Sequence, residues 1–493
     1  MQEIKRENYF LFTTIRFGDS VVERVPCKVY LPRKVADLVA LHVLPNPEQE
    51  RLLDSMFEFS IFGEIEHPNG AVTTIRADKA YSLSGEGRRW GPELSEYVMF
   101  CEPTDLKVIH TRAKTTSPVS EKIYGVFWLT PSKVLTPGQI IGRHPSGRVS
   151  VKTGRWKHTF TLKNVLRLDF KKRYIHWENE DGDDVTSSEL VAEYRQERGH
   201  DITVMDRATL DCLDDLLLLV SFASRRPCVC ARWDVSNAEG YRIEYYRRDI
   251  GIPAGGPEDR DDWLIDYSNF KQFVRSAYRN FYKVEPRDYL RQAIVYTIPD
   301  ERRSPEGSFV TLYEALESLV LYFRRRPEHR LEFVFPSDES GKGGKWKARN
   351  QIIEDTKKFL SEHPLLKNDP VKRGLLFDNL LGLNRVSFRT ALERMCEAYS
   401  VDLDEFWPIT KSGKGWSLST IRNKLVHGEH LTHQHRHALV AAGEHLRWIV
   451  ERLILAVLGW DIEKSNVSTS YLAERTYIYQ DWEADLKILS DPK

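Results

Sequence analysis

The chain lacks an excess of charge of either sign. Lysine and arginine together number 72, and so do aspartate and glutamate, so the formal net charge of the 493 residues is zero. A protein that is drawn to nucleic acid by its overall field is usually strongly basic. Any nucleic-acid surface on this chain must therefore be local.

Cysteine is scarce, and the apolar runs are short. Six cysteines are scattered through 493 residues, which is too sparse for the disulfide framework of a small secreted domain. Cys228 and Cys230 would share one face of a strand, and we expect buried thiols there, with a metal or redox pair as the less favoured alternative. The longest late apolar run, 449–460, contains Glu451 and Arg452 and is too short to cross a bilayer.

No secretion signal is expected from the first residues of the sequence either. The first eight residues carry two glutamates and lack both the apolar core and the small-residue cleavage site of a signal peptide. The composition, 41% hydrophobic and 29% charged, is ordinary for a soluble globular protein. We expect a cytoplasmic protein without a membrane partner, and the length predicts two or three domains.

The N-terminal part shows the two-residue period of β-strands. Residues 57–61 alternate apolar with polar side chains and lead through a Pro-Asn-Gly turn into a second strand at 72–75. Short strands separated by glycine, proline and asparagine are typical of β-sandwiches and barrels. We predict a mainly-β sensor or regulatory domain over 1–270, interrupted by one helix near 207–224.

A further hairpin is expected after that helix. Residues 228–233 and 241–246 have the composition of strands, joined by an Asn-Ala-Glu-Gly turn. The second strand mixes arginine with tyrosine, which could stack nucleic-acid bases, although a half-exposed sheet strand explains the mixture equally well. A break rich in glycine and proline at 251–262 then places the domain boundary between there and about residue 285.

From about residue 285 the hydrophobic period becomes helical. Apolar side chains at 309–323 form a stripe typical of a buried helix, for which Ser308 is the expected N-cap. Further helices are expected at 347–361, 371–381, 386–399 and 432–458. We predict an all-α bundle over 285–465 and a polar tail over 466–493, so the fold class is a multidomain α+β protein.

One pair of residue types in this helical part can carry phosphodiester chemistry. Arginine offers a planar, permanently charged fork for a phosphate, and histidine takes and gives a proton near neutral pH. The spacing Arg-x4-His occurs three times, at 195–200, 324–329 and 422–427. Spacing alone cannot choose among the three.

Helical context favours the third pair. The first lies in a polar stretch that contains a glycine, and Pro327 would end any helix within the second. The third lies on an uninterrupted helical segment, which begins at Ser417 or Ser419 and ends at Gly428. Asn423 and His427 are one turn apart, so we expect the amide to orient the imidazole. A capping arginine and a packed histidine are the plainer alternative for an isolated match.

Several features around this pair resemble the HEPN superfamily. They are the asparagine after the arginine, the His-Gly ending, the preceding Ser-x-Ser-Thr-Ile and the upstream segment 312–319 (LYEALESL). The chain is most similar to the ApeA-like branch, anti-phage proteins in which a strand-rich N-terminal domain precedes a HEPN helical bundle. The resemblance covers about 285–460 well and the N-terminal part only in general plan.

This resemblance implies a metal-independent endoribonuclease without a cofactor. It would act as a homodimer or a higher oligomer in which two motifs face each other in a composite active site. The catalytic residues would be Arg422, Asn423 and His427, with His427 as general acid or base and Arg422 stabilising the charge on the phosphate.

The same resemblance implies a role in defence. The substrate would be host tRNA or another cellular RNA, cut in an abortive response to infection, and a phage-derived trigger would act at the N-terminal domain. The alternative is a non-catalytic HEPN dimerisation module or RNA-binding scaffold in a defence or signalling complex.

Basic residues and histidines near the motif are weaker candidates. Lys411, Lys414 and Lys424 could contact the RNA backbone, although solvated surface is the plainer role for each. The glycine- and lysine-rich stretches 340–345 and 411–415 lack the spacing of a phosphate loop. No metal is expected, because the histidines that follow the motif match no usual zinc spacing and have no cysteine beside them. These histidines are His430, His433, His435, His437 and His445.

Overall fold

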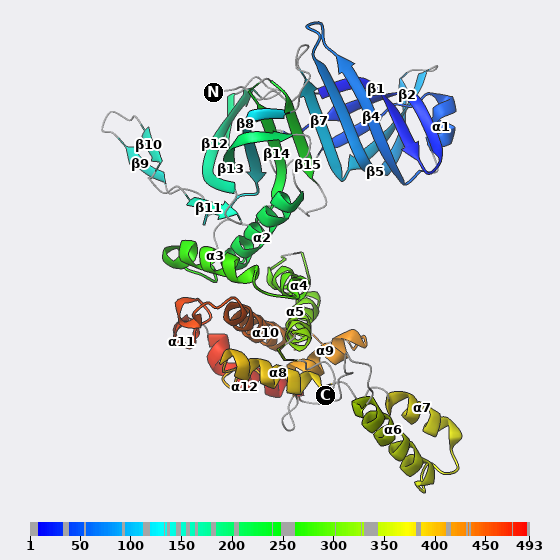
Figure 1. Cartoon of the computed structure of the whole chain (residues 1–493), viewed down its shortest axis with the longest axis vertical. Helices are drawn as coiled ribbons and strands as arrows, with labels where there is room; N and C mark the ends of the chain where they lie inside the picture. The colour runs from blue at the N-terminus through cyan, green and yellow to red at the C-terminus, as the bar shows by residue number, and fades with distance from the viewer. Residues whose placement is uncertain are drawn as a thin grey trace. The chain divides into compact units, whose positions relative to one another are not determined.

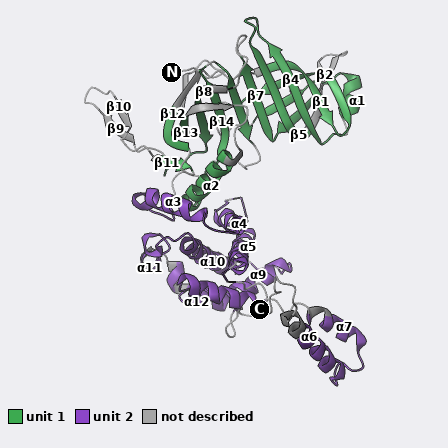
Figure 2. Cartoon of the chain, viewed as in Figure 1, with its two compact units in different colours: residues 1–262 green, residues 263–493 purple. Residues whose placement is uncertain are grey.

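The computed structural model divides the chain into two compact units, residues 1–262 and 263–493 (Figure 2). The residues that it describes are 8–32, 39–53, 56–90, 94–111, 119–132, 134–135, 139–143, 149–153, 158–162, 166–178, 184–201, 207–238, 240–247, 262–300, 302–326, 328–329, 344–380, 386–410, 416–429, 432, 435–475 and 477–490. The strand-rich unit ends earlier than the expected residue 270, because the chain enters an amphipathic helix whose apolar side chains pack in the second unit.

Antiparallel strands build unit 1 (Figure 1). The strands are β1 (Asn8–Phe17), β2 (Ser20–Tyr30), β3 (Ala40–Val43), β4 (Glu58–Glu66), β5 (Val72–Trp90), β6 (Leu94–Pro103), β7 (Asp105–Thr111), β8 (Val119–Leu129), β9 (Gln139–Arg143), β10 (Val149–Thr153), β11 (His158–Leu162), β12 (Leu166–Glu178), β13 (Asp184–Asp201), β14 (Cys230–Asn237) and β15 (Arg242–Arg247). Two helices accompany them, α1 (Pro47–Leu53) and α2 (Arg207–Ser224), the second at the residues expected.

Six of the strands close into a barrel. The first part of the long strand β5 pairs with β4 and the second part with β6, so the order β5-β4-β1-β2-β3-β6 returns to β5. Between the sandwich and barrel alternatives, the strand pairing therefore selects a barrel for this part of the unit. Such closure protects the edges of the sheet, which a sandwich would leave open.

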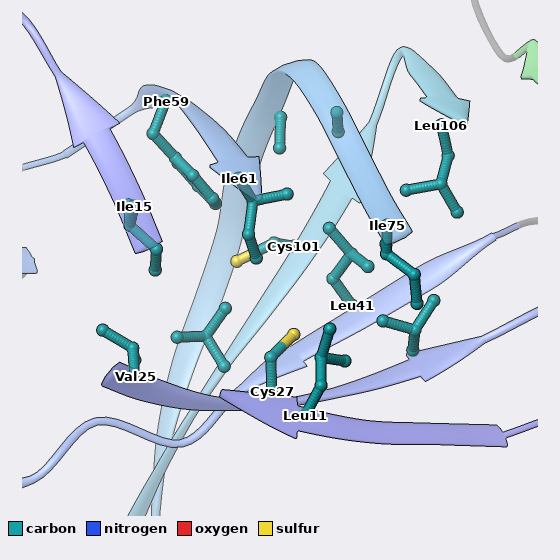
Figure 3. Close-up of a cluster of buried hydrophobic side chains, with 14 of the residues drawn as sticks. Leu11, Ile15, Val25, Cys27, Leu41, Phe59, Ile61, Ile75, Cys101 and Leu106 are labelled. Atoms are coloured by element: carbon teal, nitrogen blue, oxygen red, sulfur yellow. The ribbon is translucent and has the colours of Figure 1, made fainter. Parts of the chain in front are cut away.

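Alternating side chains fill the barrel. On β1, Leu11 and Ile15 are buried, whereas Phe10 and Phe12, on either side of Leu11, face outward and are exposed. Figure 3 shows the inward side chains of several strands converging, among them Ile61, Ile75 and two cysteines. Burial of each large apolar side chain contributes roughly 1.5–3 kcal/mol, so the interior of the barrel is a packed core.

The sheet continues from β5 into the second part of unit 1. β7 pairs with β5, and the order runs on through β15, β14, β8, β13, β12 and β11. The expected hairpin is present: β14 pairs with β15, and the amide of Tyr241 donates to Oδ1 of Asn237 at 2.8 Å across the turn. Tyr245 and Tyr246 of this hairpin are buried. The arginine–tyrosine mixture is therefore part of the packing and does not offer its rings to a nucleic acid.

The cysteine pair is buried, as expected. Cys228 and Cys230 are 2% and 0% exposed, and burial raises the pKa of the Cys228 thiol to about 12. A thiol in such surroundings stays protonated and unreactive near neutral pH.

Helices build unit 2. They are α3 (Tyr267–Phe281), α4 (Arg287–Thr297), α5 (Pro305–Arg325), α6 (Gly344–Glu362), α7 (Pro370–Leu380), α8 (Phe388–Tyr399), α9 (Leu418–Val426), α10 (Arg436–Val457), α11 (Thr469–Arg475) and α12 (Tyr477–Ser490). In the described parts of the chain, no helix has the length and apolar character needed to span a membrane.

The long helix α10 is the centre of this bundle and packs against α4, α5, α8 and α12. His445 of α10 is fully buried: its Nδ1 accepts from the amide of Trp407 at 3.3 Å, and its Nε2 donates to the carbonyl of Ile478 at 3.1 Å. The expected polar tail is thus wrong, because α11 and α12 bring buried side chains such as Leu472 and Leu489 into the packing.

Helix α5 begins earlier than expected. Ser304 is its N-cap, with Oγ accepting from the amide of Gly307 at 3.1 Å, and Pro305 follows at the first helical position. Ser308, the expected cap, lies inside the helix. The proline explains the difference, because its fixed φ and missing N–H suit the first turn.

Candidate active site

The start of α9 is anchored by its cap and its apolar residues. Oγ of Ser417 accepts from the amide of Thr420 at 3.2 Å, which satisfies one of the free N–H groups of the first turn. Leu418 and Ile421 are fully buried. Between the two expected serines, the N-cap is therefore Ser417, and the buried side chains fix which face of α9 points outward.

The end of α9 places His427 at the surface. Gly428 has φ +79°, its amide donates to the carbonyl of Leu425 at 3.1 Å, and the amide of Glu429 donates to that of Lys424 at 2.9 Å. This pair of bonds is a Schellman motif, which only glycine enters without strain. His427 is the C-cap residue just before it, and its side chain is exposed.

Arg422 is held from the side by α5, which packs against α9 (Figure 1). Its Nη2 lies 3.5 Å from Oε1 of Glu317, and its guanidinium carbon lies 5.8 Å from the centre of the Tyr313 ring. Glu317 and Tyr313 are one turn apart on the same face of α5. The guanidinium of Arg422 therefore lies against the ring of Tyr313 and beside the carboxylate of Glu317.

Tyr313 ties this support to the start of α9. Its hydroxyl lies 2.7 Å from Oγ of Ser419, and that Oγ donates to the carbonyl of Ile409 at 2.6 Å. Because the serine has a single hydroxyl proton, the tyrosine is the donor in the first bond. Burial raises the pKa of Tyr313, with the hydrogen bond to Ser419 acting in the opposite direction. The tyrosine therefore stays protonated at physiological pH.

Asn423 differs from the expectation. Its Oδ1 accepts from Nη1 of Arg422 at 3.4 Å, and its backbone carbonyl accepts from the amide of His427 at 3.0 Å. Among the described residues, no side chain is hydrogen-bonded to the imidazole of His427. The amide thus orients the arginine, because the two are neighbours in sequence and both lie at the outer face of α9.

The three lysines have different outcomes. Nζ of Lys424 forms an ion pair with Glu429 and lies 4.5 Å from the centre of the Trp416 ring, so its charge is partly neutralised within the chain. Lys411 and Lys414 fall outside the described residues, and their contact with RNA stays a prediction.

The other two Arg-x4-His pairs lack this geometry. Arg195 and His200 lie in β13, in a strand and not in the polar connection expected for them. In the second pair, α5 ends at Arg325 before Pro327, as the proline predicts, and His329 stacks on Phe323 with ring centres 4.0 Å apart. Only Arg422 and His427 share a helix and its cap.

Histidines after the motif have structural surroundings. Burial lowers the pKa of His445 to about 4, and Nδ1 of His437 lies 3.0 Å from Oδ1 of Asp485. Within the ranges that the structure describes, no group of three or more His, Cys, Asp or Glu side chains could hold a metal ion. His430 and His433 lie outside those ranges.

The arrangement on α9 can bind a phosphate and move a proton. It offers an exposed imidazole, a half-buried guanidinium and an exposed carboxamide within two turns of one helix. The sequence pattern indicated these three residues but assigned no role to Tyr313 and Glu317. Their four-residue spacing on the upstream helix is the signal that could have found them. Comparisons with protein-family models, curated proteins and solved structures find no match.

Proposed function

We propose that the chain is a metal-independent endoribonuclease of the HEPN type. The observation that supports this most strongly is the placement of Arg422 and His427 on the last turns of α9, ahead of a Schellman turn that leaves the imidazole exposed. The upstream helix on which Arg422 rests contains the LYEALESL segment of the family resemblance. The sequence pattern and the local geometry thus favour the same residues.

In the proposed mechanism, His427 acts as general base or general acid. The ribose 2'-oxygen loses its proton and attacks the phosphorus, and the bond from phosphorus to the 5'-oxygen breaks as that oxygen gains a proton. Arg422 stabilises the negative charge that develops on the phosphate oxygens. The products are a 2',3'-cyclic phosphate and a 5'-hydroxyl.

Glu317 does not prevent this role of Arg422. The pair is partly exposed, with side-chain exposures of 30% for Arg422 and 39% for Glu317, and such pairs contribute about 0–1 kcal/mol. A phosphate diester can therefore compete for the guanidinium, while Glu317 and Tyr313 hold it in place in the absence of substrate.

A twofold dimer, or an oligomer built from such dimers, would complete the site. One α9 contributes a single imidazole and a single guanidinium, whereas the cleavage needs both a base and an acid. Symmetric pairing would bring a second motif opposite the first. Sedimentation velocity of the active protein should give a dimer or a larger assembly, and an active monomer would contradict this part of the proposal.

The strand-rich unit would carry the regulation. It forms a compact unit of its own, which suits a domain that senses a phage-derived trigger and restrains cleavage of host tRNA or other cellular RNA in the cytoplasm. Cells that express the protein should stop growing on infection and not before. Arrest that is independent of infection would contradict the sensing role.

RNA cleavage by the purified protein tests the central proposal. His427→Ala should lower the cleavage rate by about 10² to 10⁴-fold, in buffer with excess chelator as well as without. His437→Ala, at an exposed histidine on α10, is the matched control and should cut like the wild type. Equal cleavage by wild type and His427→Ala would exclude the mechanism, and an absence of cleavage by both would favour the scaffold alternative.

A further inference from the structure

The outer face of the barrel carries a row of aromatic and basic side chains. Phe10 of β1 is paired with Lys28 of β2, Lys28 with His42 of β3, and His42 with Phe100 of β6. These four residues therefore lie side by side across four neighbouring strands. They are on the face opposite the core, because the residues that flank them, such as Leu11, are the buried ones.

Ring contacts on this face join Phe10 to Phe12, its outward neighbour on β1, and join His42 to Tyr30 and Phe100. Phe10 and Phe12 are each 56% exposed, and their ring centres are 6.2 Å apart. His42 lies between Tyr30, at 4.4 Å, and Phe100, at 4.8 Å. Large rings that stay exposed to water forgo the favourable free energy of burial. A surface of this kind therefore indicates a binding function.

Two basic side chains lie beside these rings. The guanidinium carbon of Arg24 lies 6.0 Å from the centre of the Phe12 ring, and Lys28 is exposed between Phe10 and His42. The sequences of β1 and β3 contain no carboxylate, that of β2 contains Glu23, and that of β6 contains Glu96 and Glu102. The chain has no net charge to attract nucleic acid as a whole, so contact with phosphates at this face would depend on these two basic side chains.

We propose that this aromatic row, Phe10, Phe12, Lys28, His42 and Phe100, binds a single-stranded nucleic acid. Unpaired bases would stack on the phenylalanine rings, and Lys28 and Arg24 would contact the phosphates. Sheets that bind RNA commonly stack two or three bases on exposed aromatic side chains of neighbouring strands. A protein partner would use the apolar area of the rings but would not need their π-faces.

Binding of a fluorescent uridine oligonucleotide of about twelve nucleotides, a usual site size, tests this. The protein is the full chain with His427→Ala, so that the RNA is not cut, and the readout is fluorescence anisotropy. Phe10→Ala and Phe12→Ala should each weaken binding about tenfold. Phe359→Ala, which removes a 65% exposed phenyl from α6, should leave binding unchanged.

Two further variants separate stacking from apolar docking and from charge. Phe12→Leu keeps apolar bulk and loses the ring, so it should weaken binding like Phe12→Ala, whereas Phe12→Tyr should bind like the parent. Lys28→Gln should lower the salt dependence of binding by about 0.7 in the slope of log K against log salt. A duplex of the same length should bind more weakly.

Three results would overturn the aromatic row as a binding site. They are equal binding by the parent and the phenylalanine variants, full retention of binding by Phe12→Leu, and no binding by the parent protein. These results are independent of cleavage: a protein that cuts RNA with Phe10→Ala and Phe12→Ala unaffected in binding would retain the proposed nuclease and lose this site. Binding through the aromatic row together with no RNA cleavage by the wild type would retain this site and exclude the proposed nuclease.

Discussion

Oε1 of Glu317 lies 3.5 Å from Nη2 of Arg422, joining the middle of α5 to the exposed face of α9. The contact is the one ion pair that the structure records for Arg422 within the described residues. On the other side, Asn423 accepts from Nη1 of the same fork at 3.4 Å. The guanidinium is thus positioned by two side chains, which is how a charge donor is held ready for a developing negative charge.

Glu317→Gln should therefore affect cleavage more than stability. The pair is partly exposed, so its loss should change the free energy of unfolding by less than about 1 kcal/mol. A less ordered Arg422 should lower kcat by about tenfold, or ~1.4 kcal/mol of barrier, with a smaller change in KM. Glu314→Gln removes an exposed carboxylate of α5 and is the control. The positioning role is wrong if both variants cut RNA equally well.

The Schellman turn makes Gly428 a sensitive position. Its φ of +79° costs a residue with a side chain about 1–2 kcal/mol, although an added Cβ would meet no atom within 4 Å. Gly428→Ala should lower the melting temperature and reduce cleavage, because the turn sets the direction of His427. Gly374→Ala, inside α7 and equally free of close contacts, should instead stabilise the helix by roughly 0.5–1 kcal/mol. Equal melting temperatures of the two variants would contradict this account.

Local signals in the sequence predicted much of the fold. Helix α2 begins and ends where its leucine spacing placed it, and the expected hairpin is present, with β14 paired to β15. Both features depend on neighbouring residues only. Closure of the barrel could not be predicted, because it depends on the pairing of β5 with β6 and of β3 with β6, and no period in a single strand encodes its partner.

The candidate site divides in the same way. Gly428 and the serine cap are local signals, so the limits of α9 followed from the sequence. The support of Arg422 by Tyr313 and Glu317 joins segments about a hundred residues apart, and only the packing of α5 on α9 reveals it. For the same reason, the sequence led to the wrong partner for Asn423. Helical spacing shows that His427 is within reach of Asn423, but the side chain of Asn423 accepts a hydrogen bond from its neighbour Arg422 instead.

Glu244 should make unit 1 sensitive to acid. It is 5% exposed, and it accepts from Tyr246 at 2.5 Å, Arg242 at 2.7 Å and Arg232 at 3.2 Å. Burial opposes its charge, but His110, with Nε2 3.7 Å from Oε1, and the two guanidinium groups lower its pKa below the usual value of 4.5. The unfolded chain therefore binds a proton first as the pH falls, and the stability from this charge is present above about pH 4.5 and lost below it.

Glu244→Ala should destabilise unit 1 by about 3–5 kcal/mol, because it leaves Arg232, whose side chain is only 11% exposed, with one partner fewer. Glu64→Ala, at an exposed carboxylate of β4, is the control and should cost less than about 1 kcal/mol. Urea unfolding at pH 7 measures both. A loss below 1 kcal/mol for Glu244→Ala would mean that the network contributes little.

His445 should make unit 2 sensitive to acid over a different range. Burial lowers its pKa to about 4 from the usual 6.5, and both ring nitrogens are already hydrogen-bonded in the neutral form. Since the folded pKa lies below the unfolded one, the unfolded chain binds the extra proton between pH 6.5 and 4. Stability from the neutral ring is complete above pH 6.5 and falls by about 3 kcal/mol as the pH approaches 4. The free energy of unfolding of the wild type minus that of His445→Gln should decrease by that amount between pH 7 and 4 in urea titrations, since the glutamine has no proton to gain. A difference that stays constant across this range would show that the imidazole titrates alike in the folded and unfolded chain, and that its burial between Trp407 and Ile478 imposes no cost on the charged form.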